Sequence, residues 1–225
     1  MNIPDNEPKA RHLIGCPNKE WESASPEELG IDRYKLAEAG RYQSEIAVDQ
    51  PYRILIIRHG KIAAEWNFRY DPTIKANQAS ASKSTFSSVL GIAIQEGVIN
   101  SENDQVANYY PEMLDVGPGE GPKEGRYVFP ENSDITFRQL IGNTSGYMKP
   151  GENCGQVFNY QTFGMNILTH AIASAYNLYK TSLPERGGGF GTLTEWKIRD
   201  PIGGRWSWTY KNFNMQPKAK LGIFG

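Results

Sequence analysis

The clearest pattern of polar and apolar positions in the sequence lies between Gln78 and Gly97. This segment begins with small polar residues, continues with apolar residues and ends at a glycine. Glycine readily adopts the left-handed conformation that follows many helices, so the pattern predicts a buried helix whose carboxyl end lies near Gly97. The other predicted elements lie on either side of this helix.

Upstream of this helix, two patterns predict a further helix and a hairpin. Apolar positions at helical spacing run from Leu29 to Ile46, with a break after which Asp32 can act as the N-cap. Residues 52–69 contain two strand-like runs around a glycine turn, which is typical of a β-hairpin. The first run, residues 52–58, is apolar on both faces, so we expect it to lie in a sheet that is covered on both sides.

Downstream, shorter helical patterns alternate with loops. Three helices are predicted, over residues 105–110, over residues 135–141 with Ser133 and Asp134 as the cap, and from Gln161 or Thr162 to about Ala175. Residues 115–133 and 178–195 are rich in glycine, proline or charge and are expected to form loops.

Composition and charge narrow the function classes. The 225 residues include 24 Lys and Arg and 25 Asp and Glu, so the net charge is −1, and no block of like charge occurs. A nucleic-acid partner and a polybasic membrane patch are therefore not expected. No apolar run reaches the roughly 18 residues of a membrane span. The polar start of the chain lacks a secretory signal, which indicates a cytoplasmic protein, or a periplasmic or secreted one if the amino terminus is incomplete.

Cysteine and histidine give little indication of metal or redox chemistry. Cys16 and Cys154 are far apart in the sequence, and two free thiols are a simpler interpretation than a disulfide, which stays open. The three histidines form no paired-ligand pattern, so we expect no metal site and no cofactor.

The candidate chemistry lies at the start of the predicted helix, where Ser80 and Lys83 form a Ser-x-x-Lys motif. Positions i and i+3 share one helix face, so the serine hydroxyl and the lysine amine can meet. A serine becomes a useful nucleophile when a base lies within hydrogen-bond reach, and an amine can serve as that base. A solvated first turn is the simpler alternative, and Ser82 and Ser84 offer competing hydroxyls.

Four motifs in order resemble the serine β-lactamase and penicillin-binding-protein superfamily. They are the Ser80–Ser84 segment with its helix, residues 104–112, residues 135–146 with Thr-Ser-Gly, and Phe158-Asn-Tyr160 before a helix. The resemblance covers residues 25–225. It is closest to the class C-like β-lactamase-related branch, which includes carboxylesterases, D-aminopeptidases and 6-aminohexanoate-dimer hydrolases.

The resemblance implies an α/β (α+β) fold of the β-lactamase/transpeptidase type. An antiparallel sheet would be flanked by helices and joined to a mostly helical lobe. On this reading residues 1–24 form an irregular arm and residues 25–225 form an incomplete domain. Within that domain, residues 52–69 belong to the sheet lobe, residues 78–180 form the helical lobe and residues 181–225 form a loop-rich tail.

The resemblance also implies roles for individual residues. Ser80 matches the nucleophile, Lys83 its partner base and Tyr160 the tyrosine of the second motif, acting on a small-molecule ester or amide. Thr162 stands where β-lactamases have asparagine and would contact the substrate. Because a hydroxyl lacks the donor and acceptor pair of an amide, this change favours ester or amide hydrolysis over efficient β-lactam hydrolysis.

A second departure concerns the third motif of the family. No Lys-Thr-Gly box occurs, and residues 180–182 (Lys-Thr-Ser) come too early in the sequence. The strand that carries this box, later sheet strands and a terminal helix are absent, so we expect an amino-terminal fragment of a longer protein. Two alternatives stay open: a catalytically inactive ligand-binding relative, and a DD-peptidase-like cell-wall enzyme.

Overall fold

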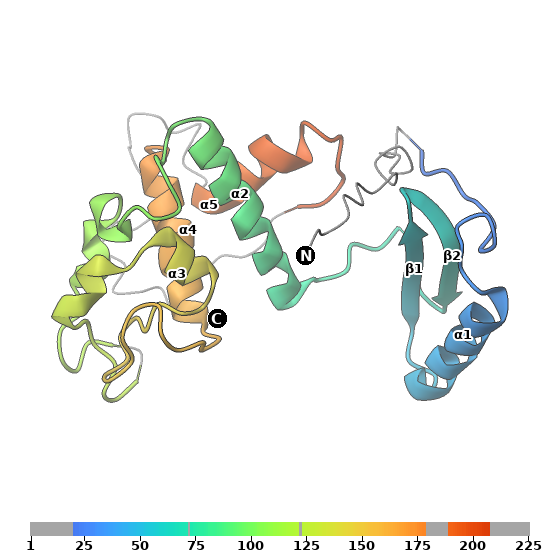
Figure 1. Cartoon of the computed structure of the whole chain (residues 1–225), viewed down its shortest axis with the longest axis horizontal. Helices are drawn as coiled ribbons and strands as arrows, with labels where there is room; N and C mark the ends of the chain where they lie inside the picture. The colour runs from blue at the N-terminus through green and yellow to red at the C-terminus, as the bar shows by residue number, and fades with distance from the viewer. Residues whose placement is uncertain (1–19, 72, 122, 179–188, 208–225) are drawn as a thin grey trace, which may run out of the picture. The chain divides into compact units, whose positions relative to one another are not determined.

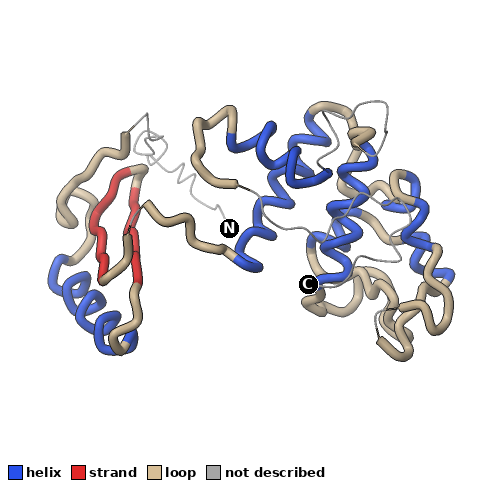
Figure 2. Tube along the Cα trace, turned by 180° about the vertical axis from the view of Figure 1, so that it is seen from behind, coloured by secondary structure: helices blue, strands red, loops and turns tan. Residues whose placement is uncertain are grey.

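The computed structural model describes residues 20–71, 73–121, 123–178 and 189–207 (Figure 1). The chain divides into two compact units, Met1–Ala76 and Asn77–Gly225. The strands drawn in Figure 2 belong to the first unit, and most of the helices belong to the second. The described chain is therefore mixed helix and strand, with a small two-stranded antiparallel sheet, which agrees with a general α+β class. None of its described helices has both the length and the apolar character needed to cross a membrane.

In the first unit, helix α1 (Arg33–Ala47) begins where the sequence predicts it. The Asp32 carboxylate accepts hydrogen bonds from the backbone N–H groups of Tyr34 and Lys35, at 2.9 and 3.1 Å. These bonds satisfy two of the amides that a helix start leaves without a helical acceptor. The predicted N-cap is confirmed.

Strands β1 (Tyr52–Arg58) and β2 (Lys61–Phe68) form the predicted hairpin. His59 and Gly60 make the turn, both in the left-handed region with φ of 53° and 75°. Two consecutive residues of positive φ are typical of the tight turns whose twist matches that of the strands.

The prediction that β1 is covered on both faces is wrong for the described structure. Leu55 and Ile57 project from one face and are 42% and 45% exposed. The sheet has two strands, and α1 lies beside it. Trp66 of β2 is so close to Gly40 of α1 that a Cβ added to Gly40 would lie 3.1 Å from the indole ring. An apolar run therefore predicted the strand correctly but not its surroundings.

The second unit is built from helices around one apolar core. Its α-helices are α2 (Ser84–Gln95), α3 (Phe137–Ile141), α4 (Thr162–Ala175) and α5 (Gly189–Thr194), followed by a π-helical turn, Glu195–Arg199. Short 3₁₀ turns occur at Ala79–Lys83, Val106–Asn108, Pro111–Leu114 and Pro130–Asp134. Helix α4 is central, because every residue from Gly164 to Ala173 is buried. Phe86 of α2 meets Phe190 of α5 edge to face, with ring centroids 5.0 Å apart.

The cap predicted for the helix over residues 135–141 is wrong. Thr136 caps α3: its hydroxyl accepts from the Gln139 N–H at 3.3 Å, and the Gln139 amide accepts from the Thr136 N–H at 2.9 Å. Ser133 and Asp134 instead belong to the preceding 3₁₀ turn. Both candidates are good caps in isolation, and the reciprocal Thr-x-x-Gln pair decides between them.

Part of the predicted loop over residues 178–195 is also wrong. Residues 189–194 form α5, in which Phe190 and Leu193 are buried in the core. The glycines before this segment favour a loop locally, but two apolar side chains three residues apart stabilise a helix once they can pack on α2 and α4. The expected loop-rich tail is thus helical where it is described up to residue 199, and residues 180–182 lie outside the described residues.

His170 makes the stability of the second unit dependent on pH. His170 is 2% exposed, its ring stacks on that of Tyr110 with centroids 5.3 Å apart, and burial lowers its pKa from 6.5 to about 4. The unfolded chain therefore binds a proton here at a higher pH than the folded chain does. We expect the free energy of unfolding to fall by about 3 kcal/mol as the pH decreases from 6.5 to 4.

Denaturant unfolding across this pH range, on the wild type and on His170→Gln, measures this contribution. The variant is expected to be less stable at neutral pH but to lose less stability on acidification. An identical pH slope in the two proteins would contradict the assignment to His170.

Candidate active site

Ser80 and Lys83 lie on a 3₁₀ turn rather than on the α-helix that the sequence predicts. The turn spans Ala79–Lys83, and α2 begins at Ser84. In a 3₁₀ turn, side chains at i and i+3 lie almost directly above one another. Lys83 Nζ donates a hydrogen bond to Ser80 Oγ at 2.8 Å. The expected meeting of hydroxyl and amine is therefore present in the structure.

The neighbouring serines point elsewhere. The Ser82 hydroxyl donates to the Ala79 carbonyl at 2.6 Å, and the Ser84 hydroxyl donates to the Ala81 carbonyl at 2.7 Å. Hydroxyls that bond to carbonyls within their own turn are held against the backbone. Of the serines in this turn, Ser80 is the one whose oxygen meets the lysine amine.

The backbone just before Ser80 is strained. Ala79 adopts φ of 43°, and its N–H donates to the Asn77 side chain at 2.8 Å. A residue with a Cβ in this region costs about 1 kcal/mol or more, and such positions are often found next to functional side chains. The bend directs the chain from the preceding loop into the turn that carries Ser80.

Tyr160 lies on a separate segment of the second unit, just before α4, and reaches the same place. Its ring centroid lies 5.5 Å from Lys83 Nζ. Hydrogen bonding with Ser80, and then with Lys83, lowers the pKa of the Tyr160 phenol from its ordinary value. The structure therefore brings Ser80, Lys83 and Tyr160 together, although the tyrosine is far from the other two in the sequence.

Thr162 is placed differently from these three residues. It is the first residue of α4 and is half-buried. The side chains that lower the pKa of Tyr160 are Ser80 and Lys83, and Thr162 is not one of them. A substrate contact for Thr162 stays a prediction.

The Thr-Ser-Gly segment approaches the backbone of the loop that leads to Tyr160. Gly146 has φ of 61°, and an added Cβ would lie only 2.2 Å from the Glu152 carbonyl oxygen. Beside it, buried Lys149 approaches the Glu152 carboxylate at 3.2 Å, and this carboxylate also accepts from Asn159 Nδ2 at 3.1 Å. Glu152 therefore joins this loop, through an ion pair with Lys149 and a hydrogen bond from Asn159, to the residue that precedes Tyr160.

Sequence reasoning missed Asn143, which contacts the chain on both sides of Tyr160. Its backbone carbonyl accepts from the Asn159 N–H at 2.8 Å, and its side-chain Oδ1 accepts from the Gln161 N–H at 3.3 Å. The position directly before Thr-Ser-Gly was available as a signal. Nothing in the local pattern, however, connects it with residues 159 and 161.

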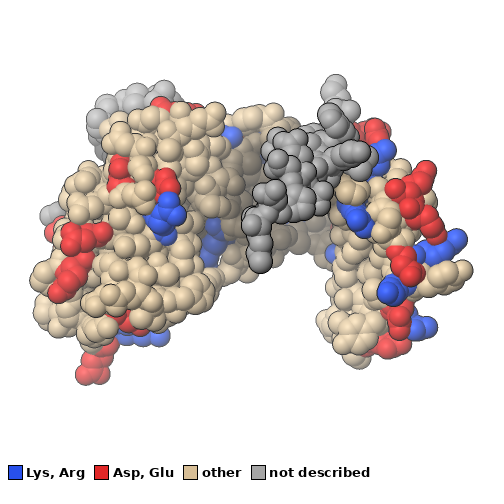
Figure 3. All heavy atoms as spheres, viewed as in Figure 1, with Lys and Arg blue, Asp and Glu red and all other residues tan. Residues whose placement is uncertain are grey.

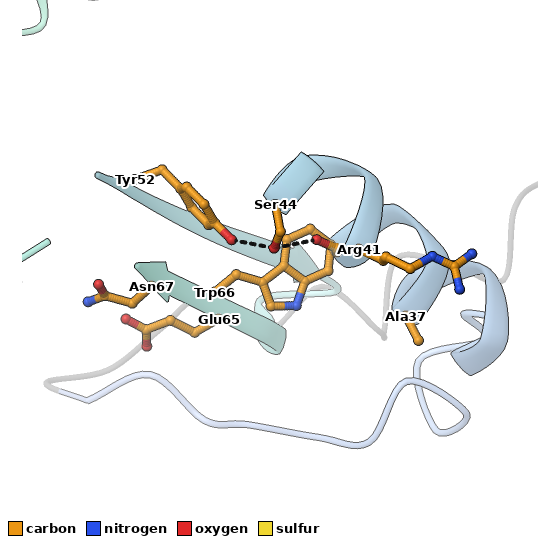
Figure 4. A pocket seen from close by; sticks show the side chains of 8 residues that line it. Ala37, Arg41, Ser44, Tyr52, Glu65, Trp66 and Asn67 are labelled. Atoms are coloured by element: carbon orange, nitrogen blue, oxygen red, sulfur yellow. Dashed lines mark hydrogen bonds between the residues drawn. The ribbon is translucent and has the colours of Figure 1, made fainter. Parts of the chain in front are cut away.

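A separate pocket of about 460 Å³ lies in the first unit, between α1 and the hairpin (Figure 4). Its walls include Arg41, Tyr52, Glu65 and Trp66, and Ser44 lies 2.9 Å from the Tyr52 hydroxyl. None of the three residues brought together above lines this pocket. Its groups include no nucleophile with a base beside it, so the candidate chemistry stays with Ser80.

Charges on the first unit alternate in sign. On the face drawn in Figure 3, acidic and basic side chains of this unit lie next to one another. Ion pairs such as Arg53–Glu65 at 2.8 Å and Lys61–Glu22 at 3.0 Å account for part of this pattern.

Among residues 20–71, 73–121, 123–178 and 189–207, no group of three His, Cys, Asp or Glu side chains could hold a metal ion. Cys154 is a free thiol.

In comparisons with known proteins, no family model matches the sequence, and no curated protein matches it.

Proposed function

We propose that the protein is a serine hydrolase that cleaves an ester or amide of a small molecule through an acyl-enzyme on Ser80. The observation that carries this proposal is the 2.8 Å contact between Lys83 Nζ and Ser80 Oγ, with the Tyr160 ring centroid 5.5 Å from the same amine. A nucleophile, a base in contact with it and a third group that contacts the base are the parts that covalent catalysis requires.

In the proposed reaction, Ser80 Oγ bonds to the substrate carbonyl carbon while its proton passes to Lys83. The lowered pKa of Tyr160 assists this step, because a phenolate beside the amine can first accept a proton from it. As the tetrahedral adduct collapses, the bond to the leaving group breaks and Tyr160 returns a proton to that group. Water then adds to the acyl carbon and gives its proton to Tyr160. The bond between that carbon and Ser80 Oγ breaks, the carboxylic acid leaves, and the proton returns through Lys83 to Ser80.

The position of Ser80 at the start of a helical segment supports this chemistry. The first N–H groups of a helix lack helical acceptors, and the partial positive charge there favours an anion. The backbone N–H of Ser80 can therefore donate to the oxyanion that forms on the substrate.

The finer fold that we propose is of the β-lactamase/transpeptidase type, in the β-lactamase-related branch. It is supported by the order in which the second unit supplies its parts: the Ser-x-x-Lys turn before α2, the Thr-Ser-Gly loop after α3 and Tyr160 before α4. With Thr162 in place of an asparagine, we infer that esters and amides are better substrates than β-lactams.

A burst experiment tests the proposed function. A chromogenic p-nitrophenyl ester, a p-nitroanilide and a chromogenic β-lactam are each mixed, in excess, with the protein. The protein concentration is high enough for one equivalent of released product to be detected. With the ester we expect a rapid release of one nitrophenol per protein chain, followed by slower turnover, because an acyl-enzyme accumulates. Cooperatively folded protein that releases no product from any of the three would contradict the proposal and favour a ligand-binding relative.

Replacing Tyr160 by phenylalanine is expected to change the pH profile of the reaction. In the wild type, kcat/KM should rise with pH and level off below pH 10, because the pKa of the Tyr160 phenol lies below its ordinary value of 10. In Tyr160→Phe this rise should move to higher pH, because Lys83 can no longer pass a proton to the phenolate, and kcat/KM at neutral pH should fall by about 10²-fold. Steady-state ester hydrolysis between pH 6 and about pH 10 measures both effects. A variant that keeps the wild-type profile would exclude Tyr160 from proton transfer.

A further inference from the structure

Tyr160 is held in its place by its backbone neighbours rather than by packing of its ring. Tyr160 is 54% exposed, although its ring centroid lies 5.5 Å from Lys83 Nζ. An exposed ring can adopt other rotamers at little cost, so its average position depends strongly on the direction of its own Cα–Cβ bond. That direction is set by the two peptide groups on either side of Tyr160.

Both of these peptide groups are bound by one residue. Asn143 accepts from the Asn159 N–H through its backbone carbonyl at 2.8 Å and from the Gln161 N–H through its side-chain Oδ1 at 3.3 Å. The first bond precedes Tyr160 and the second follows it. Asn143 therefore brackets the tyrosine on both sides.

Asn143 is itself anchored to α3. Its N–H donates to the Leu140 carbonyl at 3.0 Å, and the next N–H, of Thr144, donates to the Gln139 carbonyl at 2.8 Å. Asn143 has φ of 55°, a conformation that asparagine tolerates better than most residues with a side chain. In this conformation the backbone carbonyl and the side chain of Asn143 both accept hydrogen bonds from residues 159–161.

We propose that Asn143 is a positioning residue for the reaction, which holds the Tyr160 ring beside Lys83 and Ser80. The proposal rests on the proposed function, since the geometry that it protects is that of the acyl-enzyme site. The side-chain bond to Gln161 is the part specific to asparagine, because any residue offers a backbone carbonyl.

Asn143→Gly isolates this side-chain bond. Glycine keeps the left-handed backbone and the carbonyl that binds Asn159, and it removes only the acceptor for Gln161. We expect kcat/KM for ester hydrolysis to fall about tenfold, as for the loss of one hydrogen bond in a preorganised site. Asn143→Asp keeps an acceptor oxygen and should restore most of the rate.

The matched control is Asn177→Gly. Asn177 follows α4 as Asn143 follows α3, with φ of 57°, and its N–H donates to the Ser174 carbonyl at 2.8 Å. It contributes no group to the candidate site. We expect Asn177→Gly to leave kcat/KM unchanged, which separates the loss of the acceptor from the general effect of glycine after a helix.

Two further readouts distinguish positioning of Tyr160 from a purely structural role. In the Tyr160→Phe background, Asn143→Gly should cause little further loss of rate, because the residue it positions is already gone. In ultraviolet titration, the tyrosinate signal that disappears in Tyr160→Phe should move toward the ordinary tyrosine pKa in Asn143→Gly. An equal loss of rate in both backgrounds, or an unchanged titration, would overturn the proposal.

The titration needs no turnover, so it reads the position of Tyr160 even if the chain hydrolyses none of the substrates. Failure of the proposed function would appear as absence of turnover in the wild type, whereas failure of this inference would appear as an unmoved titration. If Asn143→Gly does not fold cooperatively, Asn143→Asp carries the test: it tolerates the left-handed backbone and keeps an acceptor for the Gln161 N–H, so its tyrosinate titration should match that of the wild type, and a titration moved toward the ordinary tyrosine pKa would overturn the proposal.

Discussion

Ser80→Ala is expected to abolish the burst and to lower ester hydrolysis by at least about 10³-fold, because it removes the nucleophile itself. Ser82→Ala, in the same turn, and Ser84→Ala, at the first residue of α2, serve as matched controls. Their hydroxyls donate to the carbonyls of Ala79 and Ala81 rather than meeting the amine. We expect the rate of ester hydrolysis in both controls to stay within a few-fold of the wild-type rate, which corresponds to about 1 kcal/mol or less in activation free energy.

Stopped-flow release of nitrophenol measures the burst amplitude in the four proteins. Circular dichroism and denaturant midpoints establish that each variant is folded. A normal burst in Ser80→Ala would place the nucleophile elsewhere. Loss of the burst in Ser82→Ala or Ser84→Ala alone would show that the wrong serine has been assigned.

Gly146→Ala is expected to destabilise the second unit by about 2 kcal/mol or more. Two effects add at this position. The backbone has φ of 61°, and the new Cβ would lie 2.2 Å from the Glu152 carbonyl oxygen. That oxygen belongs to the backbone of the same tight loop, so it cannot move aside as the end of a side chain can.

Gly151→Ala in the same loop is the matched control. Gly151 has φ of 79°, but nothing lies within 4 Å of an added Cβ there. It should lose about 1 kcal/mol through backbone conformation alone. Urea unfolding of both variants measures the difference, and equal losses would contradict the close approach of Gly146 to Glu152.

The elements that local chemistry specifies were predictable from the sequence. The Asp32 cap of α1 and the hairpin turn at His59-Gly60 follow from side chains and glycines that act within a few residues. The contact of Ser80 with Lys83 also follows from spacing alone, and it holds in a 3₁₀ turn as it would in an α-helix.

The elements that depend on distant packing were not predictable in this way. Helix α5 forms where the glycines of the sequence favour a loop, because Phe190 packs against Phe86 in the core. The cap of α3 was missed for a different reason: Thr136 and Gln139 form a reciprocal pair three residues apart, a local pattern that the sequence does contain.

The same distinction applies to the candidate site. The pairing of Tyr160 with Ser80 could be expected from the family resemblance but not from any local pattern, since the two residues lie on separate segments of the second unit. Asn143 was missed because its role consists of two contacts with a segment that begins sixteen positions later. Such contacts leave no periodic signal in a single sequence.

The most direct measurement of the central claim is the intact mass of the protein after incubation with a reactive fluorophosphonate, followed by peptide mapping. The same incubation is carried out on Ser80→Ala and on Lys83→Met. We expect one adduct on the wild type, located on Ser80, none on Ser80→Ala, and much slower labelling of Lys83→Met because the base is missing. A wild-type protein that is cooperatively folded but unlabelled, or an adduct that persists in Ser80→Ala, would contradict the assignment of Ser80 as an activated nucleophile.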